Sequence, residues 1–334
     1  MTNPSQTYPR PGDPTVAVVV CCFNAASTIG ETLLSIRAQT YSAFELLVID
    51  DGSSDGTVPV VLDYCKVDER ARLVENGINR GTAFTRQRAL ELVEAELVMF
   101  VDADDLAAPT LLERYMRRFR EEPRLIGLGC YATYFRELGV PLGVQACGPT
   151  THEEFTKLYN GNKLIFMANT TLFRRSDALE VGGYRQRLMP NDRGVRYEDY
   201  AEDLDLWCRL ADKAEEGYYL SVIPEALMYY RKPEGSLSTA SIPLMQLRMR
   251  WVKDCLVRRR SGNAEQTLAD FLDGRTAWQR LGDWRSDQAA AAFKRAAFAY
   301  SNKQILSMFL PLIWVAVMSP SLISQKARTQ RRSR

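Results

Sequence analysis

Short apolar runs alternate with amphipathic segments along the first third of the chain. Val16 to Cys22 is a continuous apolar run rich in valine, which is typical of a strand buried on both faces. Ser27 to Gln39 follows, with apolar residues at helical spacing behind a Ser/Thr start. The same alternation then predicts two helices, Thr57 to Lys66 and Gly81 to Val93, and three strands, Phe44 to Ile49, Ala71 to Val74 and Leu97 to Val101. Strands that alternate with helices predict an α/β fold with a mostly parallel central sheet.

The regularity fades after Leu125. Tyr131 to Val144 reads as strands interrupted by glycine and proline, and Glu153 to Tyr159 reads as a helix. Ala264 to Tyr300 is rich in alanine and has apolar positions at helical spacing, which predicts two or three packed helices. We therefore expect a mixed second half followed by a C-terminal helical extension.

The composition narrows the class of protein. The 334 residues are 46% hydrophobic and 25% charged, which is typical of a folded globular chain and excludes disorder as a whole. The formal net charge is only +2, so composition gives no support to nucleic-acid binding. Seven scattered cysteines and the single histidine, His152, form no zinc-binding pattern and fit a reducing, cytosolic setting best.

Acidic and amide side chains follow the predicted strands. They are Asn24, Asp50, Asp51, Asp102, Asp104 and Asp105. In open α/β sheets ligands bind beyond the carboxyl ends of the strands, where these side chains would converge. Clustered carboxylates are costly unless a cation compensates them, and oxygen ligands without nearby Cys or His select Mg²⁺ or Mn²⁺. The alternative is that Asp104 or Asp105 simply caps a helix that begins near Pro109.

Several stretches agree, in order, with one known family. They are Phe23-Asn24, Gln39-Thr40-Tyr41, Phe44-Glu45, the run from Asp50 to Asp55, Asn76 to Arg86, Asp102 to Asp105, Gly182-Gly183-Tyr184 and Glu202 to Leu210. With these stretches the chain resembles glycosyltransferase family 2 over roughly its first two-thirds. The resemblance implies a GT-A fold, a nucleotide-sugar donor, for which we expect a UDP-sugar, and inversion at the anomeric carbon.

The resemblance also implies which residues bind the donor. Asp50 and Asp51 would contact the base and ribose, and Cys22 and Asn24 would lie in the nucleotide-contacting loop. Arg86 would approach the nucleotide. The D-x-D element would consist of Asp102 and Asp104, which hold the ribose and a metal-bound diphosphate, and Asp105 could replace either one. The expected metal is Mn²⁺ or Mg²⁺.

The family pattern makes Asp203 the expected catalytic base, which would remove a proton from the attacking acceptor hydroxyl. Glu202 would lie beside it, near the acceptor. The alternative is that both are ordinary first-turn acids of the helix that carries Trp207. Glu198-Asp199 is a competing acidic pair.

The chain departs from the family pattern at two places. Cys21 stands where the family usually has proline, and Tyr230 to Pro233 lacks the histidine of the family's Tyr-Arg-x-His segment. Pro233 to Ser238 still resembles the family's closing loop. Arg231 or Lys232 could then neutralise diphosphate charge when this loop closes, although a solvated surface loop is the alternative.

A long uncharged segment lies near the C-terminus. Ile305 to Ile323 is mostly apolar and has the length of a spanning helix, but it contains Pro311 and Pro320. Basic residues flank it on both sides, which favours a shallow or re-entrant insertion over a single span. The alternative is a buried pair of amphipathic helices. Anionic lipids would explain the basic residues that follow.

These observations combine into one expected organisation. The expected parts are a flexible tail (1–14), a nucleotide-sugar-binding half (15–125), an acceptor-binding half (126–240), a helical extension (241–303) and a membrane-associating segment (304–334). We expect transfer to a glycan or lipid-linked acceptor in cell-surface polysaccharide, lipopolysaccharide or glycolipid synthesis. The enzyme would be cytoplasmic, peripheral or monotopic at the inner face of the cell membrane. The alternatives are a sugar-phosphate nucleotidyltransferase and a non-catalytic nucleotide-sugar-binding protein.

Overall fold

The chain divides into two compact units, Met1–Arg231 and Lys232–Arg334. The computed structural model describes residues 12–136, 140–168, 170–190, 194–232, 241–301 and 305–319. Four expected features therefore lie partly or wholly outside the described residues: most of the tail 1–14, the loop Pro233 to Ser238, the end of the apolar segment after Ser319, and the basic C-terminus. The finer division into five parts stays a proposal.

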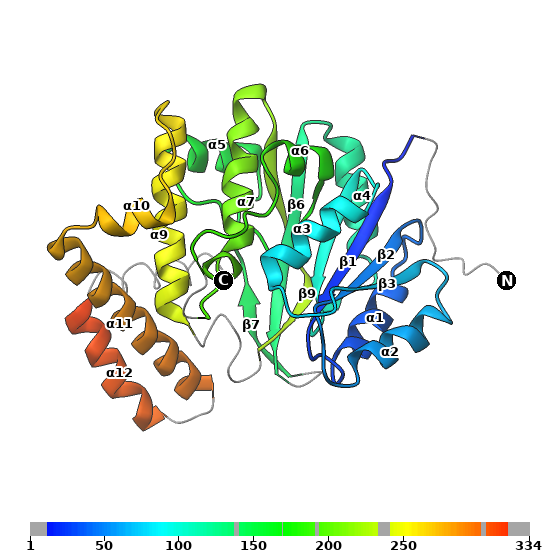
Figure 1. Ribbon diagram of the computed structural model, residues 1–334, viewed down its shortest axis with the longest axis horizontal. Helices are drawn as coiled ribbons and strands as arrows, with labels where there is room; N and C mark the ends of the chain where they lie inside the picture. The colour runs from blue at the N-terminus through cyan, green and yellow to red at the C-terminus, as the bar shows by residue number, and fades with distance from the viewer. Residues whose placement is uncertain are drawn as a thin grey trace. The chain divides into compact units, whose positions relative to one another are not determined.

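The first four strands of the first unit are parallel neighbours in the order β3-β2-β1-β4 (Figure 1). Helices connect them, as the alternating pattern predicts. The elements are β1 (Val16–Cys22), α1 (Ile29–Arg37), β2 (Glu45–Asp50), α2 (Thr57–Cys65), β3 (Ala71–Glu75), α3 (Thr82–Leu92) and β4 (Leu97–Asp102). Each predicted strand and helix of this half is confirmed, with ends that differ by at most two residues.

The remaining strands extend this sheet in a mixed arrangement. They are β5 (Leu106–Ala107), β6 (Leu125–Phe135), β7 (Pro141–Gln145), β8 (Leu172–Arg174) and β9 (Tyr219–Arg231). Strand β8 pairs antiparallel with both β4 and β6, whereas β6 and β9 are parallel. The described sheet has nine strands in the order β3-β2-β1-β4-β8-β6-β9-β5, with β7 paired to β6.

Helices and short turns connect the second set of strands. They are α4 (Leu111–Glu121), α5 (His152–Asn160), α6 (Arg175–Glu180), the 3₁₀ helix η1 (Tyr197–Asp199), α7 (Glu202–Leu210) and the 3₁₀ helix η2 (Ala211–Glu216). The Thr151 hydroxyl caps α5 by accepting a hydrogen bond from the Glu154 N–H. Trp207 of α7 packs edge-on against Phe173 of β8 in the core, with ring centroids 5.2 Å apart.

The core of the first unit explains why the sheet is built this way. Val18, Val19 and Val20 of β1 are completely buried, and so are Leu46 to Ile49 of β2. Side chains on both faces of these strands are therefore out of water, as a parallel sheet covered on both sides requires. Because β1, β2 and β4 are parallel, the polar residues that follow them share one edge of the sheet. Asp50 lies opposite Cys22, and Asp102 lies opposite Cys21.

The second unit is helical. Its described helices are α9 (Ile242–Arg260), α10 (Leu268–Asp273), α11 (Ala277–Ser301) and α12 (Ile305–Met318). Trp251 of α9 is buried and donates its indole N–H to the Gln266 carbonyl at 3.1 Å. The stretch expected to hold two or three helices contains α10 and all of α11 except its last residue, Ser301. Among the helices that the structure describes, none combines the length and apolar character needed to cross a membrane.

Candidate active site

The turn after β2 is organised by Asp50. One of its carboxylate oxygens accepts hydrogen bonds from the N–H groups of Gly52 and Ser53 at 3.0 and 2.9 Å. Gly52 has a φ of +79°, and a β-carbon there would lie 2.6 Å from the Ile78 carbonyl carbon. The turn thus packs directly against the backbone of the loop between β3 and α3. Only glycine fits both the left-handed conformation and this close approach.

We expect Gly52→Ala to lower the free energy of unfolding and to weaken donor binding. The left-handed conformation alone costs a β-carbon about 1–2 kcal/mol, and the contact with the neighbouring backbone adds to this. Gly77→Ala is the matched control, because Gly77 also has a positive φ, of +75°, but no atom would lie within 4 Å of its β-carbon. Urea unfolding and donor titration of both variants measure the difference. Equal losses in the two variants would contradict the packing argument.

Asp51 fixes the loop that opens α3. Its carboxylate accepts hydrogen bonds from the Asn76 amide at 2.6 Å and from the N–H groups of Arg80 and Gly81 at 2.9 and 2.8 Å. Asp51 is almost fully buried. These bonds use three of the roughly four acceptor positions that a carboxylate offers.

The end of β1 approaches the same turn. The Asn24 side chain accepts hydrogen bonds from the Ser54 N–H and hydroxyl, and the Asn24 N–H donates to the Ser53 hydroxyl at 2.8 Å. The buried Cys22 thiol contacts the Ile49 carbonyl and a carboxylate oxygen of Asp50. Burial and the neighbouring Asp50 raise the pKa of Cys22, so it is a neutral thiol at any physiological pH. Its position supports Asp50 and offers no charge to a ligand.

Arg86 joins the two halves of the site. Its buried guanidinium on α3 donates to Asp102 at the end of β4 and to Glu202 at the start of α7, both at 2.8 Å. The group also lies 5.7 Å from the centroid of the Phe100 ring. Two consecutive elements, α3 and β4, therefore meet the distant α7 at one cation. The guanidinium contacts two carboxylates, and its expected approach to the nucleotide stays a prediction.

Cys21 of β1 lies opposite Asp102 of β4 in the sheet. Burial raises the pKa of the Cys21 thiol to about 12, and the charges of Arg86, Asp102, Asp51 and Glu202 all act on it. The strand-end acids and the acids of α7 are thus close enough to share one electrostatic environment. Cys21 replaces the family's proline at the point where they meet.

Glu202 and Asp203 begin α7, where a helix N-terminus favours negative charge. Burial raises the pKa of Glu202 to about 8, and the opposing charge of Arg86 moderates this shift. Burial also raises the pKa of Asp203, again against Arg86. The preceding residue, Ala201, has a left-handed φ of +53°, which is strained for a residue with a β-carbon. Ala201 is the residue from which α7 begins.

The three acids after β4 have different surroundings. Asp105 is buried, and its carboxylate accepts the Arg231 N–H at 2.9 Å. The Arg231 guanidinium donates to the Asp104 carbonyl at 2.9 Å and pairs with Glu31 of α1 at 2.6 Å. Asp105 thus holds the end of β9, while Asp102 and Asp104 remain partly exposed. None of them caps α4, whose N-cap is Thr110.

Asp102 and Asp104 fit a metal ion that would take its remaining ligands from a substrate. Among the residues that the structure describes, no group of three His, Cys, Asp or Glu side chains is placed to hold an ion alone. Mg²⁺ and similar cations are commonly held by one or two carboxylates and complete their shell with water and substrate phosphates. The partly exposed Asp102 and Asp104 match that donor set, and the buried Asp105 does not.

The comparisons with known proteins bear on the family and the fold. Residues 17–182 match the family model described as glycosyl transferase family 2. An uncharacterised glycosyltransferase of Haemophilus influenzae is 27% identical over 228 residues, which cover 65% of each chain and thus less than two-thirds of that relative. The Escherichia coli UDP-Glc:alpha-D-GlcNAc-diphosphoundecaprenol beta-1,3-glucosyltransferase WfgD is 37% identical over 98 residues, or 29% of this chain and 38% of WfgD.

The chain belongs to glycosyltransferase family 2. The predicted enzyme class, a glycosyltransferase, is confirmed by the same matches. A mannosyltransferase from Pyrobaculum calidifontis, solved with GDP-Man and Mn²⁺, is similar in structure with a TM-score of 0.54 at 22% identity. The likeness covers 91% of this chain and 86% of that one. The predicted GT-A fold with a helical C-terminal region is confirmed.

Tyr184 and Asp199 support the elements that carry the site. Tyr184 of the Gly-Gly-Tyr motif packs edge-on against Phe100, with centroids 5.6 Å apart, and its N–H donates to the Gln87 side chain at 2.8 Å. Asp199 accepts the Ala83 N–H at the start of α3, and a β-carbon on Gly81 would lie 2.3 Å from its carboxylate. From the sequence alone, Asp199 was only an acid that competes with Asp203 for the role of base. No sequence signal connects it with a glycine more than a hundred positions away.

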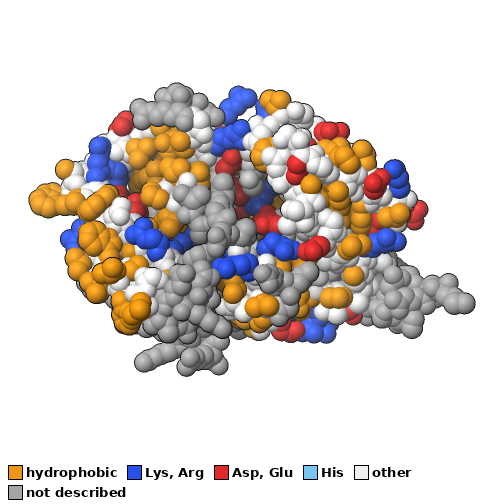
Figure 2. Space-filling view, turned by 90° about the horizontal axis from the view of Figure 1, so that it is seen from below, with side chains coloured by type: hydrophobic (Ala, Val, Ile, Leu, Met, Phe, Trp, Pro, Cys, Tyr) orange, Lys and Arg blue, Asp and Glu red, His pale blue; other side chains and the backbone are white. Residues whose placement is uncertain are grey.

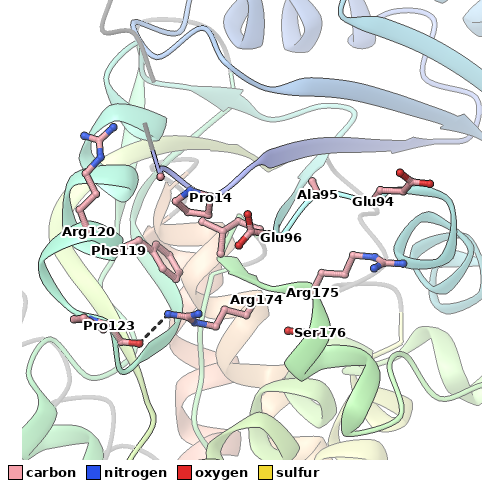
Figure 3. A pocket seen from close by; sticks show the side chains of 12 residues that line it. Pro14, Glu94, Ala95, Glu96, Phe119, Arg120, Pro123, Arg174, Arg175 and Ser176 are labelled. Atoms are coloured by element: carbon pink, nitrogen blue, oxygen red, sulfur yellow. Dashed lines mark hydrogen bonds between the residues drawn. The ribbon is translucent and has the colours of Figure 1, made fainter. Parts of the chain in front are cut away.

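A cavity of about 520 Å³ lies at the other end of the strands (Figure 3). Pro14 precedes β1, Glu96 precedes β4 and Arg174 ends the antiparallel β8, so the cavity opens at the amino-terminal edge of the parallel strands. Its arginines are already engaged: Arg174 donates to the Pro123 carbonyl and Arg120 pairs with Asp13. Ligands of parallel α/β sheets bind at the opposite edge, so we assign no donor site here.

Proposed function

We propose that this family 2 enzyme transfers a sugar, with inversion, from a nucleotide-sugar donor to an acceptor glycan or lipid-linked glycan. One observation carries the proposal: Arg86 pairs with both Asp102 and Glu202, which brings the D-x-D acids and the acids of α7 to one place. An inverting transfer needs these two functions close together, because the leaving diphosphate and the attacking hydroxyl act on the same anomeric carbon.

We place the donor at the carboxyl ends of the parallel strands. The remaining acceptor position of Asp51 would bind the base or ribose, Asp50 and Cys22 would keep the turn in shape, and Asn24 would line the loop. Asp102 and Asp104 would hold Mn²⁺ or Mg²⁺ together with the diphosphate. The bound cation supplies charge stabilisation for the departing nucleoside diphosphate. The Mn²⁺ in the similar mannosyltransferase and the UDP-glucose donor in the name of WfgD support this part of the proposal.

We place the base of the chemical step at the start of α7. Asp203 would accept the proton of the acceptor hydroxyl as it attacks, and Glu202 would be held in place by Arg86. A carboxylate whose pKa is raised is a stronger base than an ordinary Asp, which suits this step. Arg231 would keep the D-x-D turn against α1, and Lys232 would follow it into the segment that resembles the family's closing loop.

The acceptor and the location follow from relatives and from the C-terminal sequence. The full name of WfgD describes a sugar linked to diphosphoundecaprenol as its acceptor. A comparable acceptor in cell-surface polysaccharide, lipopolysaccharide or glycolipid synthesis fits this chain. We place the enzyme in the cytoplasm, peripheral or monotopic at the inner face of the cell membrane, with anionic lipids as partners of its C-terminus.

A donor screen tests the proposal. We expect one of UDP-, GDP- and dTDP-sugars to raise the melting temperature in the presence of Mn²⁺, because a ligand that binds only the folded state stabilises it by about 2.7 kcal/mol at a hundred times its Kd. The metal-dependent part of the shift should vanish in Asp104→Asn. It should persist in Asp63→Asn, whose side chain is exposed on α2 and pairs with Lys66. No stabilisation by any nucleotide sugar would refute the proposed donor class.

A further inference from the structure

Helix α12 presents a stripe of large apolar side chains to solvent. Its exposed members are Leu306, Phe309, Leu310, Ile313, Trp314 and Val317. Their spacing of three and four residues places them along one face of the helix. Leu306 and Leu310 are 87% and 78% exposed, whereas Val315 is completely buried on the inner side. Soluble surfaces rarely leave so many large apolar side chains together, and such patches mark interaction sites.

Helix α11 extends this apolar surface. Trp278 is 82% exposed, and Leu281 and Trp284 are about half exposed. The inner side of α11 is instead a ridge of buried alanines. The Arg285 guanidinium donates to the Val317 carbonyl at 3.3 Å, so the exposed part of α11 lies beside the end of α12. Figure 2 shows hydrophobic side chains gathered on the helical unit, with Lys and Arg side chains among them.

The tryptophans and the charges indicate the occupant of this surface. Three of the five tryptophans of the chain are exposed on these two helices, and the other two, Trp207 and Trp251, are buried. Tryptophan is enriched where proteins meet the headgroup level of a bilayer. No acidic residue follows Asp287, whereas eight basic residues do, in a chain whose formal net charge is only +2. Positive charge is thus concentrated in the part of the sequence that contains α12.

Two other occupants fit less well. Residues 320–334 of the chain contain only two large apolar residues, Leu322 and Ile323, too few to cover the six on α12. A second copy would carry the same eight basic residues and no acid after Asp287 to pair with them, so like charges would repel. A surface of anionic lipids accepts both the apolar stripe and the basic residues.

We propose that α11 and α12 form an interfacial anchor, in which the exposed face of α12 lies in the plane of an anionic bilayer with Trp278, Trp284 and Trp314 at headgroup level. The described α12 has 14 residues, about 21 Å of helix, which is shorter than the roughly 30 Å hydrocarbon core. This inference rests on the proposed membrane location and specifies which residues would bind the lipids. Its test does not require sugar transfer. Loss of the donor site would leave it unchanged.

Vesicle flotation of the full chain tests the anchor. We expect binding to phosphatidylcholine vesicles that contain phosphatidylglycerol, and weaker binding to phosphatidylcholine alone. Leu306→Glu/Leu310→Glu should lower the affinity for the anionic vesicles at least tenfold. Leu34→Glu is the matched control, because Leu34 is 59% exposed on α1 of the other unit, and this variant should bind as the wild type does. Unchanged circular dichroism and donor binding in both variants would show that folding and the donor site are intact.

Two further measurements sharpen the test. Brominated lipids should quench tryptophan fluorescence in the wild type, and Trp314→Phe should reduce the quenched fraction. High salt should weaken the vesicle binding without abolishing it, because the apolar part is not screened. Full binding by the double glutamate variant would overturn the proposal. So would self-association that the same variant abolishes, because the stripe would then bind a second copy.

Discussion

Asp203→Asn should abolish sugar transfer while donor affinity stays within a few fold of the wild type. An amide of the same shape cannot accept the acceptor proton, and loss of a general base costs about 10²- to 10⁴-fold in rate. Because the base acts only in the chemical step, kcat should fall and the donor Kd should not. Product formation and donor titration with Mn²⁺, measured on the same preparation, separate the two effects.

The acidic pair Glu198-Asp199, which competes with Asp203 for the role of base, provides the control. Glu198→Gln removes a carboxylate from η1 that contacts neither Arg86 nor the D-x-D turn in any described interaction, so its activity should remain close to that of the wild type. The pH profile gives a second check. Because burial raises the pKa of Asp203, activity should fall on acidification at a pH above the range of an ordinary Asp. A large loss in Glu198→Gln with little loss in Asp203→Asn would assign the base elsewhere.

Arg86→Met should cost about 3–5 kcal/mol of stability at neutral pH, together with most of the activity. Its removal leaves Asp102 and Glu202 without the cation that both contact, and breaking a buried ion pair has this effect. Without Arg86 the pKa of Glu202 in the folded state should rise further above its unfolded value. The folded protein then binds more protons than the unfolded chain, so the deficit should shrink as the pH falls towards the unfolded pKa.

Urea unfolding measures this prediction across pH. Arg86→Met/Glu202→Gln should recover part of the stability, because the unpaired buried carboxylate is removed with its partner. Arg37→Met is the control, since Arg37 is exposed at the end of α1, and it should change stability by less than about 0.5 kcal/mol. A deficit that is independent of pH, or no recovery in the double variant, would show that Arg86 acts through packing alone.

Local patterns predicted the first half of the fold well. The apolar run Val16 to Cys22 coincides with β1, and the predicted helix from Thr57 ends within one residue of α2. These elements are specified by nearby residues, because apolar periodicity and turn residues act over a few positions. Local sequence patterns could not predict that β6 pairs with β9. Those strands are parallel and nearly a hundred residues apart, and only the packing of the whole sheet brings them together.

The candidate site could be located from sequence, but its internal connections could not. Parallel strands carry Asp50, Asp51 and Asp102 to one edge, as expected. The family pattern supplied Glu202 and Asp203, yet nothing in either motif predicts that Arg86 pairs with Glu202 across 116 positions. The same holds for Arg231 and Glu31. Ion pairs between distant elements depend on side-chain direction, which periodicity does not encode. The donor, metal and catalytic roles of these residues stay predictions.

A crystal structure with Mn²⁺ and a nucleoside diphosphate tests the central claim most directly. Anomalous scattering locates the metal without reference to the protein atoms. We expect one Mn²⁺ site bounded by Asp102 or Asp104 and by diphosphate oxygens, with the base near Asp51 and the Asp203 carboxylate facing the terminal phosphate. A metal bound away from the end of β4, or a nucleotide in the cavity beside Arg174, would contradict the account.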